Sequence, residues 1–198
     1  WRITEVAHKP FPSGRATHGI VDACLTLRKD QSHAHGDIRS ALARVPPLTH
    51  HLVGRPVTKE MGINYARLCA RFVAARALIA GNVVSEDFTA EARHDPVTLS
   101  LAERIDIETD NNPDPNALSP IELEIEYYNG ARMRSRIDIV YGHPAKPMSR
   151  TAWLEKFRSN WRQSVVPLSD SACERVIERI DSLPAVTDTV NIIDDLVP

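Results

Sequence analysis

The sequence is poor in cysteine, in long apolar runs and in clustered positive charge, and each shortage excludes a class of protein. The three cysteines, Cys24, Cys69 and Cys173, lie far apart and do not form the pattern of a disulfide framework. Each falls on the apolar side of a predicted helix, where a thiol acts as a small hydrophobic group. No apolar run approaches the roughly 20 residues of a membrane-spanning helix, and the first residues carry no basic or apolar leader region. We expect a cytoplasmic protein without a membrane partner.

Positive charge is balanced by negative charge along the whole chain. The formal net charge is -2, the isoelectric point is near 6.5, and no Lys/Arg-rich run interleaves with aromatic residues. Such a sequence offers no cationic surface to a phosphate backbone, so no nucleic-acid partner is expected.

The motifs of several enzyme classes are missing as well. The sequence has no G-x-S-x-G, no glycine-rich phosphate loop and no H-E-x-x-H. His33 and His35 lie in a predicted loop and His50 and His51 are adjacent, but neither pair has a further ligand at metal-binding spacing. We therefore expect neither a metal ion nor another cofactor.

What is present is the composition of a folded domain, with 42% hydrophobic and 25% charged residues. Residues 1–12 are predicted to be extended, because their two prolines disfavour helix in the residues before them. A helix is predicted from residue 14 or 15 to residue 28, and a polar loop follows to residue 36. Residues 39–53 carry apolar and β-branched residues interrupted by Pro46-Pro47, which predicts an edge strand or a bulged one.

The strongest helix signal runs from Glu60 to Ala80. Thr58 is a plausible N-cap, Gly81-Asn82 is a typical C-terminal stop, and the residues between them are small and apolar on one side. We predict that this is the central helix of the domain. Asp95-Pro96 is a second start signal, for a helix that ends near Glu103.

Two strands, Ile121–Tyr127 and Arg132–Tyr141, flank Asn129-Gly130. Apolar residues occupy odd positions in both strands, and charged residues occupy even positions. A two-residue turn would mix the two faces, so we predict a loop of residues 128–130 with a bulge at Gly130. This register pairs Glu126 with Arg132, Glu124 with Arg134, and Glu122 with Arg136. We interpret the charge ladder as structural rather than catalytic.

After residues 142–148 the sequence pattern is purely helical. Ser149 and Ser169 are predicted N-caps of two amphipathic helices, and a last short helix is predicted at residues 187–197. Helices this short need a partner surface to bury their apolar faces. The predicted fold class is therefore α+β: residues 1–147 form a small domain with an antiparallel sheet, and residues 148–198 form helices whose partner surface is expected on residues absent from this chain. The exposed apolar faces also argue against a monomer and predict a homo-oligomer.

One segment, residues 8–18, combines charge, rigidity and a helix terminus. Lys9 and Arg15 supply cations, and the free N–H groups of the helix that begins near Gly14 point the same way, an arrangement that suits a carboxylate. The alternative is that both cations are simply solvated and that His18 lies on the first helical turn. The pattern alone leaves both interpretations open.

Four segments resemble the C-terminal part of MmgE/PrpD proteins, in order and spacing. Lys9–Ala23 looks like the K-x-F-P…A-T-H…D-A segment of that family, and Val53–Pro56 is similar to its V-N-R-P. Ala66–Gly81 resembles its A-x-x-S-x-x-Y-x-x-A…G helix, and Tyr141–Arg158 matches its Y-G-H…K-P-L-S…K-F-R. Together they cover nearly the whole chain.

The resemblance implies a division of the molecule. Family members have a large helical domain, built from the N-terminal half and the last helices, and a smaller α+β domain of the lid type that closes over the active site. This chain would supply the lid domain, residues 1–147, and the returning helices, residues 148–198. The N-terminal helical half, which carries the main acid/base histidine in the family, has no counterpart here.

The resemblance also assigns candidate site residues. Lys9 falls on the family lysine that faces the substrate carboxylates, which makes it the candidate catalytic residue, and Arg15 and His18 are candidate substrate-binding residues. His51 and Arg55 could supply further polar groups, although a structural role fits them better. Two departures argue against cis-aconitate decarboxylation: that branch has a histidine at the position of Gly14 and a tyrosine close to Leu52.

The function implied is that of a lyase acting on a small polycarboxylic acid. A base removes a proton next to a carboxyl group, and cations such as Lys9 stabilise the enolate-like charge. Dehydration of a 2-methylcitrate-like acid is the leading hypothesis, and epimerisation by the same proton chemistry is the alternative. Two further alternatives are a non-catalytic carboxylate-binding module and a split enzyme whose helical half is a separate chain.

Overall fold

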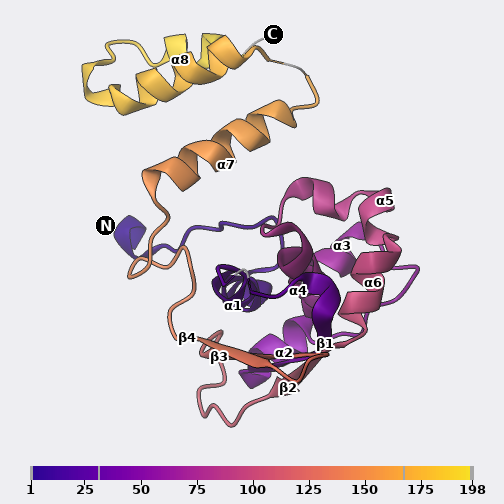
Figure 1. The fold of residues 1–198 in the computed structure, drawn as a ribbon. Helices are drawn as coiled ribbons and strands as arrows, with labels where there is room; N and C mark the ends of the chain where they lie inside the picture. The colour runs from indigo at the N-terminus through magenta and orange to yellow at the C-terminus, as the bar shows by residue number, and fades with distance from the viewer. Residues whose placement is uncertain (1, 31, 167, 197–198) are drawn as a thin grey trace. The chain divides into compact units, whose positions relative to one another are not determined.

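A computed structural model describes residues 2–30, 32–166 and 168–196 (Figure 1). The chain divides into two compact units, Trp1–Pro147 and Met148–Pro198. The expectations for Trp1 and for the last two residues, Val197 and Pro198, lie outside the described residues.

The first unit is built on a four-stranded sheet with the strand order β2-β1-β3-β4. Its strands are β1 (Ile38–Val45), β2 (Ile105–Thr109), β3 (Ile121–Tyr127) and β4 (Arg132–Ile137). β1 pairs antiparallel with β3 and parallel with β2, so the sheet is mixed. The α+β class is confirmed. The predicted antiparallel pairing is present between β1, β3 and β4, and β2, for which no strand was predicted, adds a parallel pair.

Of the two alternatives predicted for residues 39–53, the edge strand is wrong, whereas the pairing of β1 with β3 does contain a bulge or irregularity, between Ile38 and Ser40. β1 ends at Val45 and lies in the interior of the sheet, between β2 and β3. The two prolines follow the strand, and Pro47 is the first residue of helix α2 (Pro47–Val53), where a missing N–H leaves no hydrogen bond unmade. The prolines therefore end the strand and start a helix.

Helices pack on one face of the sheet. The first of them, α1 (His18–Arg28), follows a 3-10 turn, η2 (Arg15–Thr17), and contacts β3, β4 and α4 (Ala70–Ala80). Figure 1 shows α1 and α4 together over the sheet. The remaining elements of the unit are η1 (Arg2–Glu5), η3 (His35–Asp37), α3 (Ile63–Arg67), η4 (Ser85–Phe88), α5 (Ala90–Arg93) and α6 (Pro96–Ala102). The first of these, η1, corrects the prediction of an extended segment over residues 1–12.

The predicted helix over Glu60–Ala80 is two helices. α3 ends at Arg67, Leu68 and Cys69 leave the helical conformation, and α4 starts at Ala70. The predicted end is confirmed: Gly81 adopts the left-handed conformation, with φ at +76°, and caps α4. The start signal at Asp95 is also confirmed, because its side chain accepts a hydrogen bond from the Thr98 backbone N–H at the head of α6.

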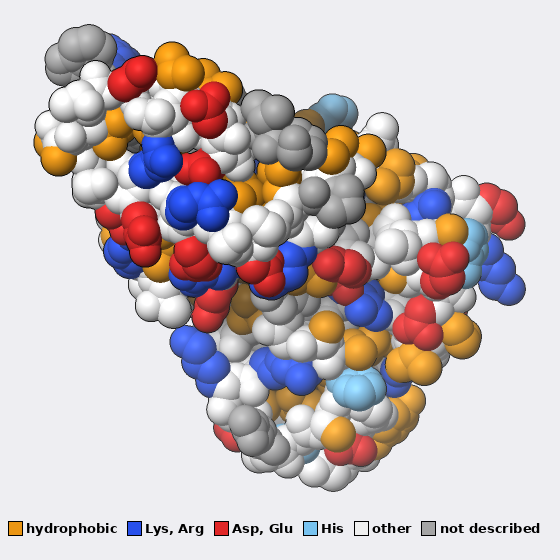
Figure 2. All heavy atoms as spheres, turned by 90° about the horizontal axis from the view of Figure 1, so that it is seen from above, with side chains coloured by type: hydrophobic (Ala, Val, Ile, Leu, Met, Phe, Trp, Pro, Cys, Tyr) orange, Lys and Arg blue, Asp and Glu red, His pale blue; other side chains and the backbone are white. Residues whose placement is uncertain are grey.

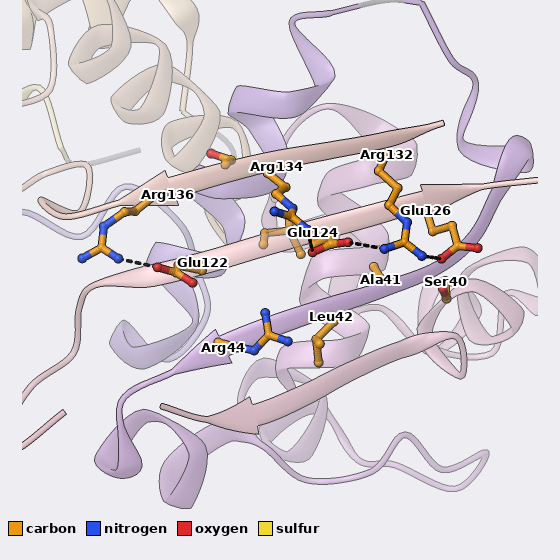
Figure 3. A pocket seen from close by; sticks show the side chains of 12 residues that line it. Ser40, Ala41, Leu42, Arg44, Glu122, Glu124, Glu126, Arg132, Arg134 and Arg136 are labelled. Carbon is orange, nitrogen blue, oxygen red and sulfur yellow. Dashed lines mark hydrogen bonds and ion pairs between the residues drawn. The ribbon is translucent and has the colours of Figure 1, made fainter. Parts of the chain in front are cut away.

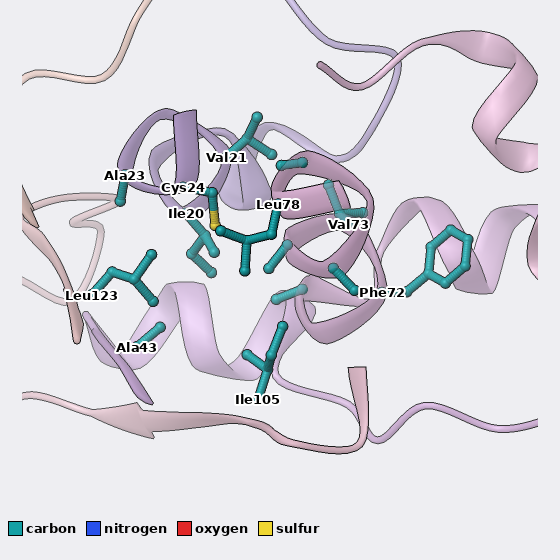
Figure 4. Packing of buried hydrophobic residues seen from close by; sticks show 14 of the residues in the cluster. Ile20, Val21, Ala23, Cys24, Ala43, Phe72, Val73, Leu78, Ile105 and Leu123 are labelled. Atoms are coloured by element: carbon teal, nitrogen blue, oxygen red, sulfur yellow. The ribbon is translucent and has the colours of Figure 1, made fainter. Parts of the chain in front are cut away.

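The core of this unit lies between the helices and the inner face of the sheet. Figure 4 shows Ile20 and Cys24 of α1 and Leu78 of α4 close together above Leu123 and Ile105 of the sheet. All five side chains are buried. Burial raises the pKa of the Cys24 thiol to about 12, so this group stays protonated and acts as a core residue.

The outer face of the sheet carries the predicted charge ladder (Figure 3). Glu126 pairs with Arg132, Glu124 with Arg134 and Glu122 with Arg136, and residues 128–130 form the loop with Gly130 at a φ of +84°. The predicted register and loop length are confirmed, and Gly130 has the positive φ that the predicted bulge requires. The Arg134 guanidinium lies 2.9 Å from the Glu124 carboxylate, and 73% of its side chain is exposed.

The exposure of this ladder predicts a small energetic role. Replacing Arg134 with alanine should change the free energy of unfolding by no more than about 0.5 kcal/mol, because the pair is solvated and Glu124 keeps a second partner, Arg132, at 3.3 Å. Urea denaturation of the two proteins measures the difference. A loss above about 1.5 kcal/mol would contradict the structural interpretation of the ladder.

The second unit consists of α7 (Arg150–Arg162), α8 (Asp170–Asp181), η5 (Leu183–Ala185) and α9 (Val190–Asp194). The side chains of Ser149 and Ser169 accept hydrogen bonds from the first turns of α7 and α8, as predicted. Its core is small: Trp161, Ala172, Cys173 and Val176. Trp153, Phe157 and Ile180 stay exposed beside a groove between α7 and α8.

Within the described residues, no helix is both long and apolar enough to cross a membrane.

Candidate functional site

Lys9 lies on an exposed segment that is tied to a distant loop. The backbone N–H of His8 donates a hydrogen bond of 2.7 Å to the carbonyl of Gly142. Gly142 has a φ of +88°, and a Cβ atom there would collide with the carbonyl oxygen of His8. The position of the segment that carries Lys9 therefore depends on a glycine that lies 133 positions further along the chain.

The same loop is held from its other side by Asp22 of α1. The Asp22 carboxylate accepts hydrogen bonds from the Tyr141 backbone N–H at 3.0 Å and from the Lys146 ammonium at 2.6 Å. Asp22 is 9% exposed, so this ion pair is shielded from solvent on one side. The contacts explain why an Asp in the first segment and a Tyr-Gly…Lys in the last belong together: they connect the start of the unit to its end.

Arg15 and His18 form the polar part of the first helical turn. The Arg15 Nη1 atom lies 3.4 Å from His18 Nδ1, and His18 Nε2 lies 3.3 Å from the carbonyl oxygen of Ser13. A carbonyl only accepts and a guanidinium only donates, so both contacts fit a neutral imidazole that carries its proton on Nε2. The ring is fully buried, and it meets Phe11 edge-on with centroids 5.3 Å apart.

Electrostatics favours that neutral ring. Burial, followed by the charge of Arg15 and then that of Lys9, lowers the pKa of His18 to about 4. Lys9 is therefore close enough to His18 for its field to act on the imidazole. Burial also lowers the pKa of Arg15 from its usual value.

These cations have no local counter-charge. Residues 6–21 contain no Asp or Glu, and Asp22 is already engaged by Lys146. Within the described part of the chain, neither Lys9 nor Arg15 forms an ion pair. On the surface drawn in Figure 2, by contrast, side chains of both charge signs are interspersed. A partly desolvated cation without a partner is costly, so this place favours an anion.

The other two candidate residues lie on or just after α2, a helix that contacts η2. His51 is exposed on α2. Arg55 donates to the Leu52 carbonyl at 3.0 Å, and its guanidinium lies over the Tyr65 ring, 5.0 Å from the centroid. Both contacts of Arg55 are local. Among the described residues, no hydrogen bond or ion pair joins either residue to Lys9, Arg15 or His18.

Gly14, at the start of the 3-10 turn, lies against the break between α3 and α4. Its N–H donates to the Arg67 carbonyl at 2.8 Å, and a Cβ atom at Gly14 would lie 2.5 Å from Leu68 Cδ2. A side chain at this position would need Leu68 to move. The described residues include no group of three or more His, Cys, Asp or Glu side chains that could hold a metal ion.

Sequence reasoning found Lys9, Arg15 and His18, and the structure brings the last two into contact. The roles of Asp22, Gly142 and Lys146 could not be predicted from the sequence, because their contacts join residues more than a hundred positions apart. The one available signal was Asp22 itself, an acid next to a run of 16 residues without acids.

Comparison with known proteins identifies a matching family and two curated relatives. The family model of the MmgE/PrpD C-terminal domain matches residues 11–182. Two curated relatives are cis-aconitate decarboxylases, from Mus musculus with 27% identity over 90% of this chain, and from Homo sapiens with 29% identity over 93%. The chain spans only 37% and 38% of the length of these relatives. Because the family model covers most of the chain, and because the predicted motifs and the α+β fold agree with it, the chain belongs to the MmgE/PrpD family.

Proposed function

We propose that this chain is the C-terminal part of a lyase that acts on a small polycarboxylic acid, and that Lys9 and Arg15 bind a substrate carboxylate. One observation carries the proposal: Lys9 and Arg15, two cations of the same segment, the second of them half-buried, have no acidic partner among the described residues. A carboxylate is the ligand that matches a guanidinium in charge and shape.

The reaction we propose is dehydration of a 2-methylcitrate-type acid. A base removes the proton next to a carboxyl group, the electron pair forms the new C–C double bond, and hydroxide leaves as water after protonation. Lys9 and Arg15 stabilise the negative charge that develops on the carboxylate. His18 is not a good candidate for the base, because both of its ring nitrogens are engaged in the buried interior. The base is expected on a helical part outside this chain.

Decarboxylation is the second candidate, and the relatives favour it. Both are named cis-aconitate decarboxylase. Loss of CO₂ leaves a carbanion next to the remaining carboxylates, and the same cations stabilise that charge. Gly14 and Leu52 depart from that branch and support dehydration instead.

The partners we propose are a polycarboxylate and a helical polypeptide that covers the exposed faces of α7 and α8, in a cytoplasmic homo-oligomer. Native mass spectrometry of the purified protein tests the assembly. A co-purifying helical polypeptide supports the enzyme, while a lone chain without turnover of 2-methylcitrate or cis-aconitate supports a non-catalytic module.

Removing either cation should weaken carboxylate binding by about tenfold to a hundredfold, which corresponds to one charge-assisted hydrogen bond. The variants are Lys9→Ala and Arg15→Ala, and the ligand is tricarballylate, an unreactive tricarboxylate. Calorimetric titration gives the dissociation constants.

The matched control is Lys29→Ala, which removes an exposed cation at the other end of α1. It should leave the affinity unchanged. Equal losses in all three variants would indicate a nonspecific charge effect, and no loss in the first two would overturn the proposed site.

A further inference from the structure

His18 is the one side chain of the candidate site that cannot contact a ligand. It is fully buried, and both of its ring nitrogens have partners inside the domain. Its neighbours on the turn are fixed too: the Ser13 and Thr17 hydroxyl oxygens lie 2.8 Å apart, and the Thr17 hydroxyl donates to the Gly14 carbonyl at 2.8 Å. A fixed imidazole can serve the site only through the group that it touches.

That group is Arg15. Its Nη1 atom is directed at His18 Nδ1, 3.4 Å away, and no other hydrogen bond restrains its guanidinium among the described residues. With one end of the fork held by the imidazole, the Nε and Nη2 edge is left to face a planar ligand with two oxygens. A long side chain that is held in one rotamer before binding loses less entropy when the ligand arrives.

We infer that His18 is a positioning residue: its buried neutral ring orients Arg15 so that the guanidinium presents a two-donor edge to a carboxylate. The inference rests on the proposed function, because it assigns a task within the same site. It differs from the family resemblance, which places His18 among the residues that bind substrate.

Two substitutions separate the two contacts of the ring. In His18→Asn, the side-chain oxygen takes the place of Nδ1 and can accept from Arg15, while the donor to Ser13 is lost. In His18→Gln, the terminal amide takes the place of Nε2 and can donate to Ser13, while the acceptor for Arg15 is lost. A purely structural histidine would tolerate both changes alike.

The test measures tricarballylate affinity for the wild-type chain and for both variants, each shown to be folded by circular dichroism. We expect His18→Asn to bind within about twofold of the wild type and His18→Gln to bind about tenfold more weakly. Equal affinities in the two variants would overturn the positioning role.

A second measurement needs no variant and no ligand. Nuclear magnetic resonance of the wild-type chain reports the rotation of the Arg15 guanidinium and the tautomer of His18. Restricted rotation and a proton on Nε2 are expected, and free rotation would overturn the inference even if a variant fails to fold. Failure of the proposed function looks different: the wild type would show no saturable binding of tricarballylate, although Arg15 stays restricted.

Discussion

Replacing Gly142 with alanine should destabilise the first unit by about 3 kcal/mol and weaken carboxylate binding. A residue with a Cβ atom at a φ of +88° costs about 1–2 kcal/mol in backbone strain. The new methyl group would also collide with the carbonyl oxygen of His8, which is a backbone atom and cannot rotate away. Overpacking of this kind adds about 1–3 kcal/mol.

The sequence contains a matched control for this substitution. Gly130 has nearly the same φ, +84°, but its added Cβ atom would meet nothing within 4 Å. Gly130→Ala should therefore cost only the backbone strain and should leave the affinity for tricarballylate unchanged. Urea denaturation and calorimetric titration of both variants provide the comparison.

The binding measurement distinguishes a displacement of Lys9 from a loss of folding stability. Relief of the collision moves the segment of His8 and Lys9, whose hydrogen bond to Gly142 is 2.7 Å long. A Gly142→Ala protein that is no less stable than Gly130→Ala would show that the loop accommodates the methyl group. One that is less stable but binds with wild-type affinity would show that Lys9 does not depend on the loop.

The parts of the fold that sequence predicts well are those set by local chemistry. The hairpin register follows from the alternation of residues 121–137, because a shift by one position would bury the charges. The serine caps of α7 and α8 and the glycine end of α4 depend on neighbours within a few residues. These local signals do not depend on contacts with distant parts of the chain.

The parts that it predicts badly are set by packing across the chain. Pro46-Pro47 predicts an edge strand or a bulged one for β1, but the partner strand β2 lies about 60 residues further along the chain, and no nearby residue indicates this pairing. The helix over Glu60–Ala80 was predicted as continuous, yet it breaks at Leu68 and Cys69, where Gly14 donates to the carbonyl of Arg67. The sequence pattern of a helix continues through Leu68 and Cys69, but the backbone leaves the helix there, next to the tertiary hydrogen bond from Gly14 to Arg67.

The candidate site shows the same division. Lys9 and Arg15 are identifiable as cations in a stretch without acids, since that is a property of sequence alone. The burial of His18 is not identifiable, because a histidine on a first turn is exposed or buried according to what covers it. Here Phe11 lies against the ring and Arg15 approaches Nδ1, and these contacts support the inferred positioning role of His18.

Acidification should remove about 3 kcal/mol of folding free energy through His18 alone. Burial and the charges of Arg15 and Lys9 lower the pKa of His18 to about 4, whereas the unfolded chain has the ordinary value of 6.5. Between these two pH values the unfolded state binds a proton that the folded state rejects, so stability falls as the pH falls through this window. Each pKa unit contributes about 1.4 kcal/mol, and the loss through this group levels off below pH 4.

His18→Gln isolates this contribution, because all the carboxylates of the chain are common to both proteins. The variant should be less stable than the wild type at pH 7 and should regain about 3 kcal/mol relative to it by pH 4. Urea denaturation across the range gives the difference, and a nuclear magnetic resonance titration should place the His18 midpoint near pH 4. Stability curves that run parallel from pH 7 to pH 4 would mean that folding does not lower the pKa of His18, and this would contradict a ring that stays buried and neutral.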